Sequence, residues 1–269
     1  MDVKLSGIVV TFNEARFLPE TLRRLSFCDE LIVIDLGSQD NCVEIAEKAG
    51  ATVLHHEWVR FGEQVRQFAI DHAQYDWILF ADPDLYFPEG IGERLKGLLQ
   101  ACEGQELALV HLPIFTCFGG KPLLYGQKGG ARSYTAVINR RRIEPIQGLL
   151  HHRGLVALPG GFSLGLLRKD GEGILHLWIN SIADAYAKGR RYLPNEGESR
   201  HASQGSQTAG KRFSWRGAVI EVLKSIKLDL THAVFRDRRA VQVMLFQVWY
   251  LWNANLAWRR FERELAKAK

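Results

Sequence analysis

The stretch that decides the fold is Trp77-Ile78-Leu79-Phe80-Ala81-Asp82-Pro83-Asp84, an apolar run followed at once by two carboxylates. A run that is apolar at every position is typical of a parallel strand buried on both faces. Open α/β sheets bind ligands at the carboxyl ends of such strands, and Mg²⁺ or Mn²⁺ is usually held by one or two carboxylates plus substrate phosphates. The stretch therefore predicts a metal–diphosphate site for a nucleotide substrate. The alternative is an ordinary turn, for which Asp-Pro-Asp is also suited.

Residues 3–90 repeat one unit, an apolar run followed by a helical pattern. The predicted strands span residues 5–10, 31–34, 51–54 and 77–81. The predicted helices lie near residues 17–25, 41–49 and 62–73. This alternation predicts a Rossmann-like, mostly parallel sheet flanked by helices, because parallel neighbours need a crossover connection.

The pattern changes in the middle of the chain. Short β-like runs at 107–112 and 134–138 are separated by Gly-rich turns, which predicts antiparallel or mixed strands. The polar residues 195–210 predict a hinge or flexible loop.

Two basic, aromatic-rich amphipathic helices are predicted at 213–235 and 240–264. We therefore divide the chain into an α/β domain over residues 1–207 and a C-terminal helical extension over residues 208–269.

Composition gives the setting of the protein. The four cysteines have no metal-ligand spacing, and no apolar signal segment precedes the first strand, which favours core thiols in a reducing cytosol. Residues 208–269 carry 13 Lys and Arg against 5 Asp and Glu, which leaves 22 against 25 for the remainder. Such a basic, aromatic segment suits an anionic membrane surface or nucleic acid. The most apolar stretch, 241–258, contains two Gln and two Asn and does not read as a membrane span.

Four polar segments are predicted to follow the first four strands. They are Thr11-Phe12-Asn13-Glu14, Asp35-Leu36-Gly37-Ser38-Gln39-Asp40, the stretch 55–66, and Asp82-Pro83-Asp84. Each has an ordinary explanation, since strand-to-helix turns favour Asn, Asp, Gly and Ser, and Asp40 could cap the next helix. Together they would line one rim of the sheet, which capping alone does not require.

These motifs resemble the family 2 glycosyltransferases of GT-A fold. The resemblance is carried by Val9-Val10-Thr11-Phe12-Asn13-Glu14, by Ile32-Val33-Ile34-Asp35-Leu36-Gly37-Ser38-Gln39-Asp40, and by Asp82-Pro83-Asp84. Phe61-Gly62-Glu63-Gln64-Val65-Arg66-Gln67 is similar to a segment of the lipopolysaccharide-core β-1,4-glucosyltransferase subgroup. The likeness is strong over residues 3–90 and thin beyond residue 195.

The resemblance implies inverting transfer of a sugar from a nucleoside-diphosphate donor that is UDP-linked. It also implies that Mg²⁺ or Mn²⁺ bridges the diphosphate of the donor to the acidic motif. It implies donor-binding roles for Thr11, Asn13, Glu14, Asp35, Arg66 and Asp82. Asp84 would be the direct metal ligand, with Asp82 at the ribose or a metal-bound water. Arg66 would stabilise the departing diphosphate, and its alternative is an ordinary cation on a helix surface.

An inverting reaction needs a base for the acceptor hydroxyl, and here the chain departs from its relatives. The subgroup usually has His-Glu where this chain has His151-His152. His152 would then be the base, since histidine titrates near neutral pH. The alternatives are a base elsewhere, such as Glu144, reduced activity, or a His pair that only fills a loop.

Two further positions bear on the metal. Relatives commonly have Asp-Ala-Asp-Glu where this chain ends the motif with Leu85, so both key carboxylates remain while a secondary contact is lost. His176 matches a family position and would ligate metal or contact the diphosphate. Its apolar flanks also fit a hydrogen-bonded core histidine.

The predicted C-terminal helices fit an anionic bilayer interface through aromatic and basic residues. These residues are Phe213, Trp215, Trp249, Trp252, Trp258, Lys211, Arg212, Arg216, Arg236, Arg238 and Arg239. The alternative is that the aromatic residues pack on the catalytic domain or across a homodimer. Nucleic-acid binding ranks last.

We therefore predict a cytosolic hexosyltransferase, peripheral on the inner face of a bacterial inner membrane, acting on a lipid-linked or lipopolysaccharide-type glycan. The alternative function is a catalytically silent GT-A domain that binds a nucleotide sugar or glycan. A nucleotidyltransferase fits less well, because no Gly-rich loop with a basic residue follows the first strand.

Overall fold

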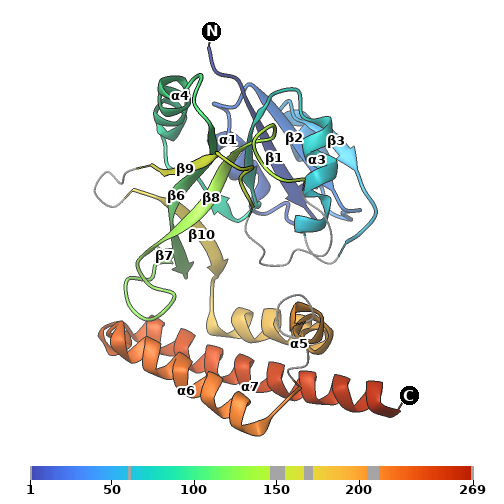
Figure 1. Ribbon diagram of the computed structural model, residues 1–269, viewed down its shortest axis with the longest axis vertical. Coiled ribbons are helices and arrows are strands. Elements are labelled where there is room, and N and C mark those ends of the chain that lie inside the picture. Colours follow the sequence, from blue (N-terminus) through green and yellow to red (C-terminus); the bar gives the residue numbers. More distant parts are fainter. Residues whose placement is uncertain (1, 60–61, 146–154, 167–171, 205–211, 268–269) are drawn as a thin grey trace. The chain divides into compact units, whose positions relative to one another are not determined.

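The computed structural model describes residues 2–59, 62–145, 155–166, 172–204 and 212–267 (Figure 1). The chain divides into two compact units. The sheet unit comprises Met1–Phe115 and Ala131–His176, and the helical unit comprises Thr116–Gly130 and Leu177–Lys269. The domain boundary predicted at 207/208 stays a prediction.

The strands of the described residues belong to one sheet. They are β1 (Leu5–Thr11), β2 (Glu30–Asp35), β3 (Thr52–His55), β4 (Trp77–Ala81), β5 (Leu85–Tyr86), β6 (Leu107–Phe118), β7 (Lys121–Pro122), β8 (Ala131–Asn139), β9 (Phe162–Gly165) and β10 (Ile174–Ile179). Their order is β3-β2-β1-β4-β8-β6-β10-β5, with β7 and β9 paired to β6.

The first four strands pair in parallel, and the later pairings are mixed. β1 pairs in parallel with β2 and β4, and β2 pairs in parallel with β3. β8 is antiparallel to β4 and β6, while β9 is parallel to β6. The predicted α/β class is confirmed, as are the mixed strands expected in the middle of the chain.

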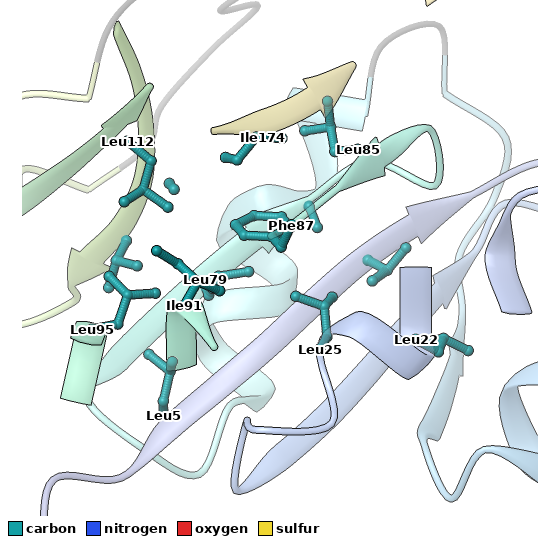
Figure 2. Close-up of a cluster of buried hydrophobic side chains, with 14 of the residues drawn as sticks. Leu5, Leu22, Leu25, Leu79, Leu85, Phe87, Ile91, Leu95, Leu112 and Ile174 are labelled. Carbon is teal, nitrogen blue, oxygen red and sulfur yellow. The ribbon is translucent and has the colours of Figure 1, made fainter. Parts of the chain in front are cut away.

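Helices cover both faces of the parallel strands. They are α1 (Leu18–Arg24), α2 (Cys42–Lys48), the 3₁₀ turn η1 (Gly62–Val65), α3 (Arg66–His72) and α4 (Ile91–Ala101). Leu5 and Val9 of β1 join the core cluster that includes residues of α1, α2 and α4, part of which is drawn in Figure 2. Ile8 joins the other cluster, which includes residues of α3. Alternate side chains of one strand thus enter two cores, which explains why the run is apolar throughout. The cysteines are free thiols, and Cys42, Cys102 and Cys117 are buried.

The helical unit contains α5 (Ile182–Gln204), α6 (Trp215–Thr231), the 3₁₀ turn η2 (Val234–Arg236) and α7 (Arg238–Lys267) (Figure 1). α7 packs along both α5 and α6. The hydrophobic core of the helical unit includes Ile179, Ala185, Val234, Val243 and Phe246. The two predicted C-terminal helices are therefore present.

The hinge predicted at 195–210 is wrong for its described part, because α5 continues through Gln204. Polar residues here face helical partners: Glu196 Oε1 accepts a hydrogen bond from Tyr250 Oη at 2.6 Å. Arg200 donates to Glu221 at 3.0 and 3.2 Å. At Gly197 a Cβ atom would lie 2.7 Å from the Ala257 carbonyl oxygen, so glycine permits the close approach of α5 and α7. Tertiary contacts thus make this polar segment helical.

The aromatic residues of the C-terminal helices divide between packing and exposure. Trp249 lies 4.7 Å from the Tyr186 ring, and Trp258 is buried beside Phe213. Trp215 and Trp252 remain 46% and 38% exposed. Across the described residues, none of the helices combines the length and the apolar character that crossing a bilayer requires.

Candidate functional site

The carboxyl ends of the parallel strands bring the predicted polar segments to one rim. In the sheet, Thr11 is in register with Asp35, and Asp35 with His55. β4 lies on the other side of β1 and leads directly into Asp82. The order β3-β2-β1-β4 makes this rim the place where α/β sheets bind their ligands.

Asp35 is buried at the end of β2 and shapes the turn that follows it. Its carboxylate accepts the backbone N–H of Gly37 at 3.2 Å and of Ser38 at 3.1 Å. Gly37 has a φ of +85°, a conformation that glycine adopts without steric cost. The exposed His55 places Nδ1 at 3.4 Å from Asp35 Oδ2. Asp35 therefore organises the rim as well as lining it.

The loops after β1 and β2 are tied by reciprocal hydrogen bonds. The Asn13 backbone N–H donates to Ser38 Oγ at 3.0 Å, and Asn13 Oδ1 accepts the Gln39 N–H at 2.7 Å. Asp40 accepts the N–H groups of Ala15 at 2.9 Å and Cys42 at 3.1 Å. Burial alone would raise the pKa of Asp40, but these bonds and one from the Cys42 thiol lower it below its usual range. Both loops are thus held as one rigid edge.

The buried Cys42 thiol contacts two residues at the end of β1 and in the loop that follows it. Its Sγ lies 3.3 Å from Thr11 Oγ1 and accepts the Glu14 N–H at the same distance. Burial raises the pKa of the Cys42 thiol, which therefore stays protonated at neutral pH. The predicted donor residues Thr11 and Glu14 are fixed by a thiol that sequence reasoning assigned only to the core.

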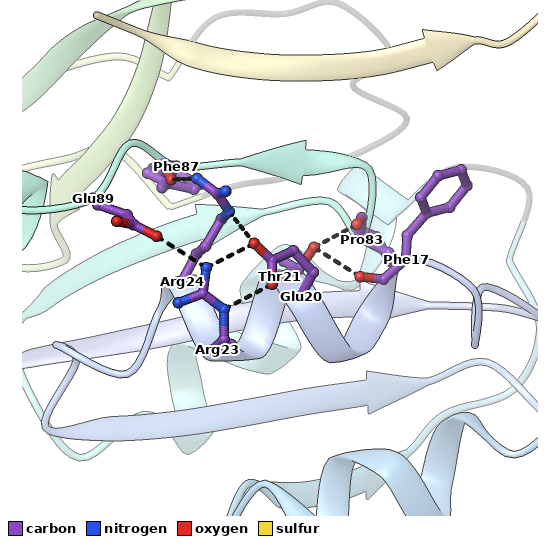
Figure 3. A network of polar contacts seen from close by, with 8 residues as sticks. All are labelled: Phe17, Glu20, Thr21, Arg23, Arg24, Pro83, Phe87 and Glu89. Atoms are coloured by element: carbon purple, nitrogen blue, oxygen red, sulfur yellow. Dashed lines mark hydrogen bonds and ion pairs between the residues drawn. The ribbon is translucent and has the colours of Figure 1, made fainter. Parts of the chain in front are cut away.

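The acidic turn after β4 is anchored to α1 (Figure 3). Thr21 Oγ1 donates to the Pro83 carbonyl at 2.5 Å, and the Leu85 N–H donates to the Asp82 carbonyl at 2.9 Å. Pro83 is buried, whereas Asp82 is exposed. The turn thus presents both carboxylates on a backbone that α1 holds in place.

Residues of α1 also bind the segment that follows the acidic turn, at Phe87 and Glu89. Arg24 donates to the Phe87 carbonyl at 2.8 Å and pairs with Glu20 at 2.6 Å (Figure 3). Arg23 joins Glu20 to Glu89. Hydrogen bonds from the two arginines lower the pKa of Glu20 to about 2. This ionic network fastens α1 to the segment after the acidic turn.

Asp84 and His176 meet through the short pairing of β5 with β10. His176 is in register with Leu85, and its Nε2 lies 3.4 Å from Asp84 Oδ2. The two side chains are 27% and 20% exposed, so both reach solvent. The structure therefore places His176 at the acidic turn rather than in an apolar core.

This pair fits a divalent cation that shares its coordination with a substrate. Two ligands at about 2.1 Å from one ion and at right angles are about 3 Å apart, close to the observed separation. No cluster of three or more metal-suited His, Cys, Asp or Glu side chains occurs among the described residues. Oxygens of a diphosphate would have to complete the shell, as is usual for Mg²⁺.

Arg66 begins α3 and approaches the same strand end. Its guanidinium carbon lies 5.1 Å from the centre of the ring of Phe80, which is two residues before Asp82. Stacking on an aromatic face fixes a planar cation at little cost. Arg66 is thus half-buried at the end of β4, not extended on the helix surface.

The predicted base cannot be placed in the same way. His151 and His152 lie outside the described residues. Glu144, the alternative, is exposed, and its backbone N–H donates to the Val156 carbonyl. The identity of the base stays a prediction.

Sequence reasoning missed the residues that hold the site together. Thr21 and Cys42 contact site segments, and neither was proposed to do so, whereas Ser38 and His55 lie in segments that were expected at the rim. Nothing in the pattern around Thr21 signals its bond to Pro83.

The sheet order defines a doubly wound α/β protein, and its polar rim lies at the carboxyl ends of the strands, where proteins of this class bind ligands. Residues 6–156, more than half of the chain, match the sequence profile of Glycosyl transferase family 2. The chain belongs to this family, and its sheet unit has the predicted GT-A-type fold.

Relatives share parts of the chain. An uncharacterized glycosyltransferase of Rickettsia bellii (strain RML369-C) is 37% identical over 109 residues, covering 40% of this chain and 36% of the relative. The lipopolysaccharide core biosynthesis glycosyltransferase LpsC of Rhizobium meliloti (strain 1021) is 26% identical over 104 residues, 37% of this chain and 38% of the relative. The chain thus spans well under half of the length of these curated relatives.

A likeness to solved structures is limited to part of the chain. Glucosyl-3-phosphoglycerate synthase from Mycobacterium tuberculosis, solved with Mn²⁺, UDP and glucosyl-3-phosphoglycerate, is 21% identical with a TM-score of 0.34. The match covers 44% of this chain and 45% of that one.

Proposed function

We propose that this protein is an inverting hexosyltransferase that uses a nucleoside-diphosphate sugar, UDP-linked, and a lipid-linked or lipopolysaccharide-type glycan acceptor. The observation that carries the proposal is the Asp84–His176 pair at the carboxyl end of β4 in a family 2 chain. The likeness to LpsC supports the class of acceptor.

The donor would lie along the rim. Thr11, Asn13, Glu14 and Asp35 would surround the nucleoside, because the tied loops bring their segments together. Rigid loops lower the entropy lost on binding. The Asp35 carboxylate is already engaged by two backbone N–H groups, so it would orient the turn at the nucleoside.

The diphosphate would lie at the acidic turn. Asp84 and His176 would hold Mg²⁺ or Mn²⁺, with Asp82 beside them, and the ion would neutralise charge on the diphosphate. Arg66, fixed on Phe80, would add a second positive charge for the leaving group. His152 is the proposed base for the acceptor hydroxyl, with Glu144 as the alternative.

Calorimetric titration of UDP with and without Mn²⁺ tests the donor site. In the wild type we expect metal-dependent binding, and Asp84→Asn should weaken it by at least about tenfold. Asp184→Asn, which changes an exposed aspartate of α5, is the matched control and should bind as the wild type does. Equal binding by wild type and Asp84→Asn would remove Asp84 from the site.

A silent nucleotide-sugar-binding domain is the second candidate. Leu85, where relatives commonly have glutamate, is buried in the core cluster of β1 and cannot act at the metal. Release of UDP from UDP-sugars separates the candidates. A silent domain binds the nucleotide without releasing UDP, whereas a transferase releases it faster when an acceptor is added.

We further propose that the helical unit attaches to an anionic membrane surface at the cytosolic face, and the exposed residues of α6 support this proposal. On α6, Trp215, Val219, Leu223 and Leu230 recur at helical spacing, and all four are more than two-fifths exposed. Arg216, Lys224 and Lys227 lie on the same helix. An exposed apolar stripe with a basic border is typical of a helix that lies in a bilayer interface.

A further inference from the structure

A cavity of about 540 Å³ lies within the helical unit, among α5, α6, α7 and the segment around Gln127. This volume is in the range of pockets that bind small molecules, roughly 300–1,000 Å³. Its wall is predominantly apolar and includes Trp178, Phe246 and Leu251. The donor-site residues described above belong to the sheet unit, so the cavity is a separate feature.

The polar groups of the wall are largely engaged with one another. The side-chain amide nitrogen of Gln127 lies 2.6 Å from Ser225 Oγ, 2.8 Å from Gln247 Oε1 and 3.0 Å from Asp229 Oδ2. The Tyr250 hydroxyl donates to Glu196. A ligand rich in hydroxyl groups, such as a sugar, would have to break these bonds, whereas an apolar chain would not.

Charge around the cavity favours an anion. Lys128, Lys188 and Lys224 line it, and the Lys128 ammonium lies 5.9 Å from the centre of the Trp178 ring. Glu221 is the one acidic residue among the described lining residues, and its carboxylate is held by Arg200 at 3.0 Å and Asn255 at 2.7 Å. The three lysines thus outnumber the one acidic lining residue, whose charge Arg200 offsets. The buried carboxylate of Asp229, which accepts hydrogen bonds from Gln127, is not among the lining residues.

We propose that this cavity binds a phosphorylated lipid, with one hydrocarbon chain against the aromatic wall and the phosphate among Lys128, Lys188 and Lys224. α6 lines the cavity through Lys224 and Leu228 and also carries the exposed apolar stripe. A bilayer surface bound by that stripe would therefore lie along the helix that borders the lipid site. The site goes beyond the proposed donor chemistry and does not depend on it.

Dodecyl phosphate, kept below its micellar concentration, is the probe for the full-length chain. Isothermal titration should give saturable binding of dodecyl phosphate, at least tenfold weaker binding of dodecyl maltoside, and none of inorganic phosphate. Equal affinity for both detergents would overturn the role of the lysines. Binding of inorganic phosphate as tight as that of dodecyl phosphate would overturn the role of the apolar wall.

Variants locate the site. Lys224→Glu should weaken dodecyl phosphate binding at least tenfold, and so should Leu228→Trp, which adds volume at a position 44% exposed. Lys227→Glu is the matched control, because Lys227 is an exposed lysine of α6 that does not line the cavity. If Lys224→Glu and Lys227→Glu lose the same affinity for dodecyl phosphate, general surface charge explains the binding and the site is overturned. If Lys224→Glu and Leu228→Trp both bind as the wild type does, the ligand lies elsewhere and the site is also overturned.

Failure of the lipid site can be told apart from failure of the donor site. UDP binding with Mn²⁺ is measured on the same wild-type preparation. A chain that binds UDP but not dodecyl phosphate overturns the lipid site alone, and the reverse result overturns the donor site alone.

Discussion

His176 Nε2 lies 3.4 Å from Asp84 Oδ2, so two residues from distant parts of the sequence meet at the end of β4. The contact depends on β5 pairing with β10, which sets His176 opposite Leu85. A carboxylate and an imidazole that both reach solvent can bind a cation together with the substrate.

Replacing His176 by alanine should lower the Mn²⁺-dependent affinity for UDP by about 10- to 100-fold, since one of the two proposed protein ligands is lost. Calorimetric titration of UDP at fixed Mn²⁺ measures the change. His72→Ala is the control, because His72 is an exposed residue of α3. If both variants bind UDP as tightly as the wild type, His176 has no part in the metal site.

Thr21→Val should loosen the acidic turn, because it removes the hydrogen bond to the Pro83 carbonyl inside the protein. An unpaired buried carbonyl costs about 1–3 kcal/mol in the free energy of unfolding. Urea unfolding measures this cost, and UDP titration should show weaker binding as well. Thr21→Ser keeps the hydroxyl and should bind UDP like the wild type. A Val variant as stable as the Ser variant would contradict the anchoring role.

The Glu20 network should make stability depend on acid pH. Hydrogen bonds from Arg23 and Arg24 lower the pKa of Glu20 from 4.5 to about 2. Stabilisation by a carboxylate with a lowered pKa is complete above the unfolded value and is lost as the pH falls through the folded value. The difference in Tm between wild type and Glu20→Gln should therefore be constant above about pH 5 and shrink as the pH falls below 4.5.

Glu47→Gln, at an exposed position of α2, provides the comparison for Glu20. Its Tm difference from the wild type should be small at every pH. A Glu20→Gln difference that grows on acidification would show that the network does not stabilise the fold.

The exposed stripe of α6 should mediate binding to anionic vesicles. Val219→Glu combined with Leu223→Glu should reduce sedimentation with vesicles that contain phosphatidylglycerol, because it adds negative charge and removes apolar area. Val156→Glu alters an equally exposed apolar residue of the sheet unit and serves as the control. Unchanged sedimentation of the double variant would argue that the stripe has another partner.

Much of the sheet unit could be predicted because its periodicity is local. The runs at 5–10, 31–34 and 77–81 coincide with β1, β2 and β4. Because both faces of these strands are buried, each strand is a continuous apolar run, and such runs can be recognised in the sequence. The alternation with helices also predicted the shared rim, where Thr11 and Asp35 are in register.

The helical unit was harder to predict because its helices are stabilised by one another. Residues 195–204 follow directly after Pro194 and contain two glutamates and a glycine, a composition typical of a loop. Hydrogen bonds from Tyr250 and to Glu221 supply the missing stability. Local propensity is a weak guide where tertiary contacts of this kind are available.

The sequence by itself determined the α/β class, the strand ends and the residue types at the rim, because burial on two faces and parallel crossovers leave a local pattern. Only the tertiary structure decided that His176 meets Asp84, that Thr21 anchors Pro83, and that three lysines share one cavity. These contacts join residues far apart in the chain. Their geometry depends on strand register and helix packing, which no local pattern encodes.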